Sequence, residues 1–411
     1  MPEFLKLVSP DDALNCWIDN FPPGKPEVEK VQTAGLYGRV TAEDILSPHP
    51  LPTFARSTVD GYAVRAKDTF GSSESLPSYL KLVGEVQMGQ PAEVKLNPGS
   101  AVLIHTGGML PEGADAVVML ENTQSSRPGE IEVLKAAAPL ENTIQIGEDV
   151  QAGEIVIPAG TKIRAAEIGG LMAFGFHSAQ VARIPRVGII STGDEVVDPS
   201  VSPSIGQVRD INTYTLQSIV NENGGEAKFF GIVPDDPEKL KMSLDLALQE
   251  CDAVLITAGS SASARDMTSS VIDKAGKPGV VVHGINIRPG KPAILAVCDG
   301  KPVIGLPGNP VSALVIAWLF VPQMLQKLQN QKSLSLKKQI SARLSVNIAS
   351  QAGREDYIPV KLTNVKDGFE AEPIFFKSNL IFNLVKADGL MVIPADANGL
   401  NAGDTVQVLF L

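Results

Sequence analysis

The chain has 411 residues, more than the roughly 250 to 300 at which a single hydrophobic core stops growing, so we expect several domains. Its 46 acidic and 35 basic residues give a formal net charge of −11, opposite in sign to a nucleic-acid-binding surface, so DNA and RNA are not expected partners. The chain does not start with a basic stretch followed by an apolar run, which predicts a cytoplasmic protein. The most apolar run, residues 313–321, is too short to cross a bilayer and precedes Pro322, so we expect a buried helix and no membrane contact.

The cysteines and histidines favour neither a disulfide framework nor a transition-metal site. Cys16, Cys251 and Cys298 lie far apart without paired spacing, and we expect all three to be reduced core residues. The four histidines are equally scattered, without the close pair that a metal-binding helix uses.

Proline-rich stretches and changes of pattern divide the chain into four expected parts. Residues 1–46 and 142–181 form a discontinuous N-terminal linking domain, with a helix expected over residues 165–174. Residues 47–141 are rich in Gly, Val and Pro with short alternating runs, which predicts an inserted small β domain. Residues 182–330 form an α/β domain, and residues 331–411 a small β-barrel-like domain.

The α/β domain has the clearest pattern, because apolar runs, polar loops and amphipathic helices alternate along it. This alternation predicts a doubly wound, mostly parallel sheet. Two of its helices have readable starts, with Asp236 and Asn309 as N-caps, each followed by proline. The predicted strands are residues 187–190, 227–233, 253–256, 280–282, 293–297 and 303–306.

Polar residues follow directly on the predicted strands of this domain. In an open parallel sheet, ligands bind beyond the carboxyl ends of the strands, so these loops should meet in one cleft. The cleft would carry both acidic and basic side chains, which predicts a single mixed-charge site. The loops are residues 191–195, 234–236, 259–266, 288–291 and 307–310.

The basic part of this expected cleft suits an anion. The helix that begins after Asn309 should present main-chain N–H groups near Val311 and Ser312, which favour an anion such as phosphate. Arg288 and Lys291 would strengthen that preference. No P-loop or dinucleotide fingerprint follows any predicted strand, so ordinary kinase and dehydrogenase functions are not expected.

The acidic part suits a hard cation, because Mg²⁺ takes one or two carboxylates together with substrate phosphates. Each residue also has a plainer interpretation: helix capping alone explains Asp236, and Glu195 and Lys291 could be solvated surface charges. Only their expected convergence favours a functional site. The acids are Asp194, Glu195, Asp235, Asp236 and Asp266.

Three motifs together resemble the molybdopterin molybdenumtransferase family, which includes bacterial MoeA and the gephyrin E domain. They are Ser-Thr-Val-Asp-Gly-Tyr-Ala at residues 57–63, Ser-Thr-Gly-Asp-Glu at residues 191–195 and Leu-Pro-Gly-Asn-Pro-Val-Ser at residues 306–312. The resemblance implies an elongated four-domain homodimer in which the N-terminal domain contributes to dimerisation. It also implies substrates, namely adenylyl-molybdopterin and molybdate, and Mg²⁺-dependent adenylate cleavage that yields molybdenum cofactor and AMP. Molybdopterin adenylyltransferase and apo-molybdoenzymes are the further partners to consider.

The resemblance also implies roles for residues that match the family's motifs. Asp60 and Thr106 would come from the other subunit's β domain. The implied catalytic residues are Asp60, Glu195, Asp235 and Asp266, of which Glu195, Asp235 and Asp266 would bind the metal. The implied substrate-binding residues are Thr106, Ser261, Arg288, Lys291, Asn309 and Ser312.

Two departures from the family pattern leave alternative functions open. Ala258 and Ser263 replace glycines of the usual Gly-Gly-x-Ser-x-Gly, and Ile144 stands at or near a usual arginine. A side chain in such a loop narrows a pocket that glycine would leave open. One alternative is a non-catalytic or regulatory relative that binds molybdopterin or molybdate. The other is an adenylate-cleaving enzyme that acts on a different organic anion.

Overall fold

The computed structural model describes residues 7–258, 262–332, 339–375 and 377–410, and the chain folds into two compact units. The fold is a multidomain α/β and β arrangement, as expected from the sequence. The four domain boundaries predicted above stay a prediction. Unit 1 contains Met1–Glu43, Ala159–Ile168 and Ser178–Leu411, and unit 2 contains Asp44–Pro158 and Gly169–His177.

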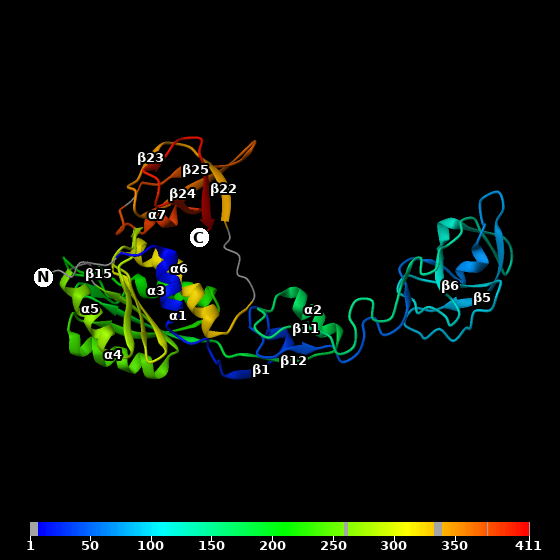
Figure 1. Cartoon of the computed structure of the whole chain (residues 1–411), viewed down its shortest axis with the longest axis horizontal. Coiled ribbons are helices and arrows are strands. Elements are labelled where there is room, and N and C mark those ends of the chain that lie inside the picture. Colours follow the sequence, from blue (N-terminus) through cyan, green and yellow to red (C-terminus); the bar gives the residue numbers. More distant parts are fainter. Residues whose placement is uncertain (1–6, 259–261, 333–338, 376, 411) are drawn as a thin grey trace. The chain divides into compact units, whose positions relative to one another are not determined.

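The centre of unit 1 is a six-stranded sheet (Figure 1). The first four strands are parallel and the last two are antiparallel to their neighbours, so the sheet is mostly parallel. In sheet order the strands are β16 (Glu226–Val233), β13 (Arg186–Thr192), β17 (Ala253–Ala258), β21 (Lys301–Pro307), β20 (Ile294–Cys298) and β18 (Pro278–His283).

The antiparallel step between β20 and β21 departs from the predicted strand-helix alternation. Only Asp299 and Gly300 separate the two strands, and both have positive φ, 49° and 85°. This is the two-residue hairpin turn that Asp-Gly favours. The Asp-Gly pair between two apolar runs was therefore a hairpin signal in the sequence.

Helices cover both faces of the sheet, and alternate residues of β13 point to opposite faces. Ile189 packs in the cluster that contains Trp17 and Phe320, whereas Ile190 packs with Leu240 and other residues on the opposite face. The helices on the first face are α1 (Pro10–Asp19), α3 (Asn212–Glu222) and α6 (Pro310–Leu328). Those on the second face are α4 (Pro237–Glu250) and α5 (Ala262–Lys274).

Helix α6 extends beyond the apolar run predicted from the sequence. It has 19 residues and continues through Pro322, whose missing N–H is tolerated because Val321, Met324 and Leu325 are fully buried around it. Over the described ranges, it is the one helix long and apolar enough to cross a membrane, and 61% of its apolar window is buried inside the fold. That burial is typical of a core helix.

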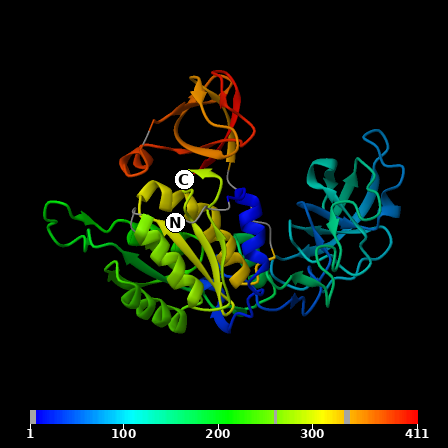
Figure 2. The ribbon, with the colours of Figure 1, turned by 60° about the vertical axis from the view of Figure 1, so that its left-hand side comes forward.

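The C-terminal strands close into a barrel, shown in orange to red in Figure 2. The ring runs from β24 through β25, β22, β28 and β26 back to β24. A two-residue strand from the α/β part, β19 (Ile287–Arg288), pairs with β24 from outside the ring. The barrel strands are β22 (Gln339–Leu344), β24 (Glu355–Val365), β25 (Gly368–Pro373), β26 (Gly389–Ile393) and β28 (Thr405–Phe410).

Unit 2 contains a second six-stranded sheet, in agreement with the inserted β domain. Its order is β7 (Ala116–Met119), β4 (Gly61–Val64), β6 (Ser100–Ile104), β5 (Ser78–Val86), β9 (Glu130–Val133) and β8 (Thr123–Arg127). Gly61 lies so close to β7 that a Cβ there would be 2.1 Å from the Val118 carbonyl oxygen. Only glycine fits at that position. The expected helix over residues 165–174 is α2 (Ala165–Ala173).

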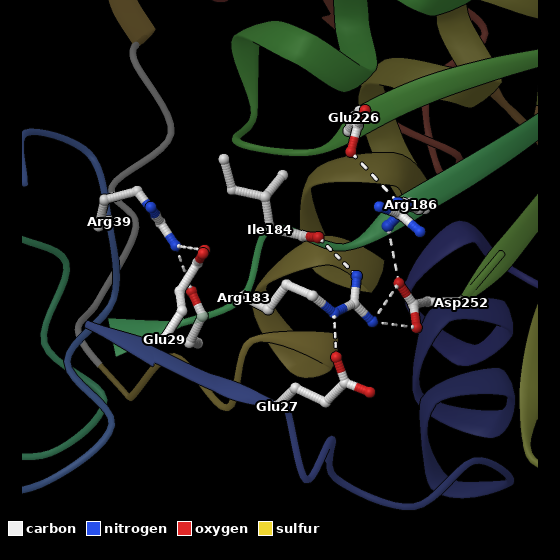
Figure 3. Close-up of polar contacts among 9 residues, drawn as sticks. Glu27, Glu29, Arg39, Arg183, Ile184, Arg186, Glu226 and Asp252 are labelled. Atoms are coloured by element: carbon white, nitrogen blue, oxygen red, sulfur yellow. Dashed lines mark hydrogen bonds and ion pairs between the residues drawn. The ribbon is translucent and has the colours of Figure 1, made fainter. Parts of the chain in front are cut away.

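An arginine joins the linking segments of unit 1 to the α/β sheet. β1 (Val28–Gln32) pairs with β12 (Ser178–Ala182), and Arg183 follows β12. Figure 3 shows the Arg183 guanidinium between Glu27, at 3.0 Å, and Asp252, at 2.9 Å. It also donates to the Ile184 carbonyl at 2.9 Å. The guanidinium therefore connects the two-stranded sheet of β1 and β12 to the end of the central sheet at which β17 begins.

The cysteines are not all in the core. Cys251 and Cys298 are buried, as predicted, but Cys16 is exposed, so the expectation was wrong there. Cys16 lies on the solvent-facing side of α1, whose core positions include Ala13 and Trp17.

Candidate functional site

The order of strands spreads the predicted site residues along one edge of the sheet. Asp235 follows β16, Asp194 and Glu195 follow the adjacent β13, and Asn309 follows β21, two strands away from β13. Adjacent strands lie about 4.8 Å apart, so the acidic loop after β13 and the turn after β21 are separated by about 10 Å along the edge. Strand β17 lies between β13 and β21, and the predicted Ser261, which follows β17 in the sequence, falls outside the described residues. The predicted mixed site therefore contains an acidic group and a basic region side by side.

The acidic group consists of Asp194, Glu195 and Asp235. The main-chain N–H of Asp235 donates to Oδ1 of Asp194 at 3.1 Å. Partial burial raises the pKa of the Asp235 carboxyl, and the charges of Asp194 and Glu195 raise it further. Gly193 allows the tight approach, because its φ is 142° and a Cβ there would lie 2.8 Å from Oε2 of Glu195. The three carboxylates therefore repel one another unless a cation or a proton intervenes.

A complete metal site is not assembled from protein groups alone. Within the described ranges, no three His, Cys, Asp or Glu side chains are grouped closely enough to hold a metal ion. Asp266, on α5, makes no hydrogen bond or ion pair with the residues that the structure describes. The assignment of Glu195, Asp235 and Asp266 to a metal stays a prediction.

The basic region is a cavity of about 550 Å³ at the start of α6. Five basic side chains line it, and no acidic side chain is among the described residues of its wall. The predicted Arg288, Lys291, Asn309 and Ser312 are all brought together here. The cavity therefore suits an anion with several negative oxygens. Its basic side chains are Arg265, Arg288, Lys291, Arg354 and Lys377.

Three polar residues of the cavity come from the barrel region and were missed from the sequence: Arg354, Lys377 and Ser378. Arg265 of α5 falls in the predicted loop 259–266 but was not predicted as a binding residue. No local pattern marks the barrel residues, because they flank strands of a separate sheet. The basic character of Arg354 and Lys377 in an acidic chain was the only available signal.

A buried carboxylate positions two of the arginines. Asp356, whose side chain is 1% exposed, accepts hydrogen bonds from Nε of Arg354 at 2.8 Å and from the Ser350 hydroxyl at 2.9 Å. Nη1 of Arg288 lies 3.6 Å from the same carboxylate. Because its charge is compensated, Asp356 is held in place and orients both guanidinium groups around the cavity.

The beginning of α6 differs in one respect from the expectation. Asn309 occupies the N-cap position, but its side chain donates to the Ser378 hydroxyl at 3.1 Å and does not cap the helix. The Val311 N–H, expected to be available to an anion, donates instead to the Ser378 carbonyl at 3.1 Å. The Ser312 N–H has no partner within the described parts of the chain, so it stays available as predicted, and the Asn309 N–H, which was not predicted, is available as well.

In unit 2, the predicted Asp60 and Thr106 lie together. Oδ1 of Asp60 accepts from the Thr106 main-chain N–H at 2.7 Å and from its hydroxyl at 3.1 Å. These bonds lower the pKa of the Asp60 carboxyl, with a smaller contribution from His105, 3.8 Å away. Both residues remain predicted site residues. The two bonds between them are also enough to fix the Asp60 carboxylate without any functional role.

Family models cover nearly the whole of this arrangement. The model "MoeA N-terminal region (domain I and II)" matches residues 8–175, and "MoeA C-terminal region (domain IV)" matches residues 341–411. The segment that carries the acidic group and the start of α6, residues 188–327, matches "Probable molybdopterin binding domain". A protein named molybdopterin molybdenumtransferase from Haemophilus influenzae is 32% identical over 405 residues, which cover 98% of each chain. The chain belongs to the MoeA family.

Two further proteins are similar to this chain, one in sequence and one in structure. A molybdopterin molybdenumtransferase from a Nostoc species is 33% identical over 401 residues, covering 94% of this chain and 89% of its own. The crystal structure of a molybdopterin biosynthesis moeA protein from Pyrococcus horikoshii superimposes with a TM-score of 0.85 at 33% identity. It covers 99% of this chain and 100% of that chain.

One departure from the MoeA pattern can be placed in the fold. Ala258 is the last residue of β17, is 3% exposed and pairs in register with Pro307 of β21. Its methyl group is therefore accommodated in the sheet at the edge of the site. Ser263 lies in α5, whose first side chains fall outside the described residues.

Proposed function

We propose that this MoeA-family chain is a molybdopterin molybdenumtransferase. It inserts molybdate into adenylyl-molybdopterin and cleaves the adenylate in a Mg²⁺-dependent step, giving molybdenum cofactor and AMP. The observation that carries this proposal is the cavity at the start of α6, lined by five basic side chains. The names and full-length similarity of the curated relatives support the same activity.

The basic cavity provides what two oxyanions require. Molybdate and a phosphoanhydride both carry negative oxygens that need charged donors and main-chain N–H groups. Arg288 and Lys291 supply charge, while the Asn309 and Ser312 N–H groups supply directional donors. Cleavage of a phosphoanhydride requires mainly positioning and charge neutralisation, which these groups provide without a covalent intermediate.

The acidic group fits Mg²⁺ by its chemistry. Its carboxylate oxygens are ligands that Mg²⁺ prefers, and a cation would offset the partial burial and the neighbouring negative charges that raise the pKa of Asp235. One or both of Glu195 and Asp235 would hold the ion together with substrate phosphate oxygens, and Asp266 stays the third predicted metal ligand. When bound, the ion supplies positive charge at the phosphates.

The test is AMP release from adenylyl-molybdopterin with Mg²⁺, with and without molybdate, coupled to reactivation of an apo-molybdoenzyme. The wild-type protein should release AMP in a molybdate-dependent manner and reactivate the acceptor. Lys291→Ala should lower the rate about ten- to hundredfold, because a charged contact to the substrate is lost. Lys241→Ala, which removes an exposed lysine of α4 paired with Asp245, is the matched control and should leave the rate unchanged.

Two other outcomes would favour the alternative functions. Tight molybdate binding without AMP release would indicate a non-catalytic relative, which the departures at Ala258 and Ser263 keep open. In that case, glycine at both positions should restore turnover. AMP release that does not depend on molybdate would indicate an enzyme for another organic anion.

We further propose a cytoplasmic homodimer with a site shared between subunits. The support is the family's pattern at Asp60 and Thr106. Asp60→Asn and Glu195→Gln should each abolish activity in a homodimer, while mixed heterodimers should recover one working site. Complete failure of this complementation, with heterodimers shown to form, would contradict the shared site.

A further inference from the structure

Asn212, the first residue of α3, carries an unexplained buried group. The residue is 8% exposed, and its Nδ2 donates to the Gly308 carbonyl at 2.9 Å. Its other side-chain atom, Oδ1, is buried without a hydrogen-bond partner among the described residues. A buried amide oxygen left unpaired costs stability, so such a group in a folded protein calls for a functional explanation.

The partner of Asn212 belongs to the turn that opens the basic cavity. If α6 continued one turn toward its N-terminus, the Gly308 carbonyl would accept the N–H of Ser312, four residues on. Instead, Asn309 is extended, with φ −66° and ψ 123°, and the Gly308 carbonyl is bound to Asn212. The Ser312 N–H therefore stays unpaired within the described parts of the chain.

The same bond orients a second donor. The peptide between Gly308 and Asn309 is not among the cis bonds of the chain, so its carbonyl and its N–H point in opposite directions. Because Asn212 holds the carbonyl, the Asn309 N–H is directed to the other side. Gly308, Asn309 and Ser312 all line the basic cavity.

The start of α3 is itself held in place. Asp210, 3% exposed, accepts from the Thr213 N–H at 3.1 Å and from its hydroxyl at 2.6 Å. Main-chain bonds of 2.9 Å from Asp210 to Val197 and of 2.8 Å from Val208 to Glu195 connect this segment to the acidic group. Main-chain bonds to the loop of the acidic group thus fix the position of Asn212, and its side chain holds the Gly308 carbonyl at the basic cavity.

We propose that Asn212 is a positioning residue for the oxyanion of the substrate. It holds the Gly308 carbonyl away from α6, so that the N–H groups of Asn309 and Ser312 remain directed at the bound anion. This inference rests on the proposed function, because it assumes that the cavity takes an oxyanion. Asn212 does not itself touch the substrate and acts through the Gly308 carbonyl.

The experiment compares Asn212→Leu with the wild-type protein in molybdate binding, measured by isothermal titration calorimetry, and in thermal unfolding. Leucine keeps the size but removes both the donor and the unpaired oxygen. We expect the Kd for molybdate to rise about tenfold or more, with a matching rise in the molybdate KM and a smaller change in kcat. The Tm should change little, because removal of the unpaired Oδ1 offsets the loss of the bond to the Gly308 carbonyl. A purely structural hydrogen bond would give the reverse, a lower Tm with unchanged Kd.

Two control variants test whether the effect is specific to Asn212, and a second substitution of Asn212 is held in reserve. Asn223→Leu removes an amide that donates to the Ile219 carbonyl at the far end of α3, and it should leave molybdate binding unchanged. Ser243→Ala removes another buried unpaired oxygen, on α4, and shows what that removal alone does to the Tm. If Asn212→Leu fails to fold, Asn212→Ser, whose hydroxyl is too short to replace the amide, tests the same expectation.

The outcomes separate this inference from the proposed function. If the wild-type protein and the Asn212→Leu variant bind molybdate with equal affinity, the positioning role is overturned and the proposed function is not affected. Folded wild-type protein that binds no molybdate would instead overturn the oxyanion assignment of the cavity.

Discussion

The main-chain N–H of Asp235 donates to Oδ1 of Asp194 at 3.1 Å, and this bond joins the loops that follow two adjacent parallel strands. It brings the Asp235 carboxylate close to Asp194 and Glu195, whose charges help to raise its pKa. The folded chain thus maintains a local repulsion that the unfolded chain does not have.

Asp235→Asn should make the folded protein more stable at neutral pH. For an acid whose pKa is raised on folding, stability is fully present below the unfolded pKa and is lost as pH rises through the folded pKa. Asparagine cannot ionise, so the Tm difference between variant and wild type should grow as pH rises above about 4. The gain should be on the order of 0.5 kcal/mol, since the site is partly exposed.

Thermal unfolding from pH 3.5 to 7.5 measures this difference. Asp236→Asn is the control. The Asp236 carboxylate caps α4 by accepting from the Glu238 and Lys239 N–H groups, and an asparagine side chain can cap the helix in the same way. An Asp235→Asn variant that is less stable than wild type above pH 5 would show that the aspartate is held by attraction.

Mg²⁺ should stabilise the wild-type protein through the same carboxylates. A ligand at ten times its Kd raises the free energy of unfolding by about 1.4 kcal/mol. We expect millimolar MgCl₂ to raise the Tm of wild type and to raise it much less in Asp235→Asn and Glu195→Gln. NaCl at equal ionic strength is the control for screening. Equal shifts in all three proteins would place the ion elsewhere.

Arg183→Ala should destabilise the α/β part. The guanidinium is 28% exposed and bonds to Glu27, Asp252 and the Ile184 carbonyl, so its loss removes the ion pair with the partly buried Asp252 and the bond to the Ile184 carbonyl. We expect a loss of about 1 to 3 kcal/mol in urea unfolding. Lys241→Ala breaks an exposed pair with Asp245 and should cost less than about 0.5 kcal/mol. Similar losses in the two variants would contradict this interpretation of the network in Figure 3.

The three thiols should react at very different rates. Cys16 is exposed, whereas burial raises the pKa of Cys251 and raises that of Cys298 to about 11. At pH 8 only about one in a thousand Cys298 thiols would be ionised, and access is also blocked. Labelling with a chromogenic disulfide should show one fast thiol in the native protein and three after unfolding. Cys16→Ser should abolish the fast phase.

Much of the fold was predictable because its signals are local. Apolar runs followed by polar loops predicted the strands of the α/β sheet, and Asp236 before proline predicted the start of α4, which its side chain caps. The antiparallel pair β20 and β21 was missed because the Asp299-Gly300 turn was not recognised as a hairpin. The length of α6 was underestimated because buried packing around Pro322 offsets its missing donor.

Four residues of the basic cavity were predictable from the sequence, but the layout of the site was not. The separation of acidic group and basic cavity depends on strand order, which no local pattern reports. Arg354 and Lys377 come from the barrel region, and their approach to Arg288 depends on pairing between segments far apart in sequence. Asn212 was missed because its importance lies in one buried hydrogen bond to Gly308.

The two-residue strand β19 belongs to the α/β part by sequence and to the barrel by pairing. Tyr357, Leu384 and Leu390 of the C-terminal region also pack in the same hydrophobic cluster as the central sheet. A protein cut before Gln339 would keep every strand of that sheet and still expose one side of its core. Cooperative melting should therefore include both parts, and the C-terminal region cannot be exchanged between relatives as an independent module without also replacing Ile287 and Arg288.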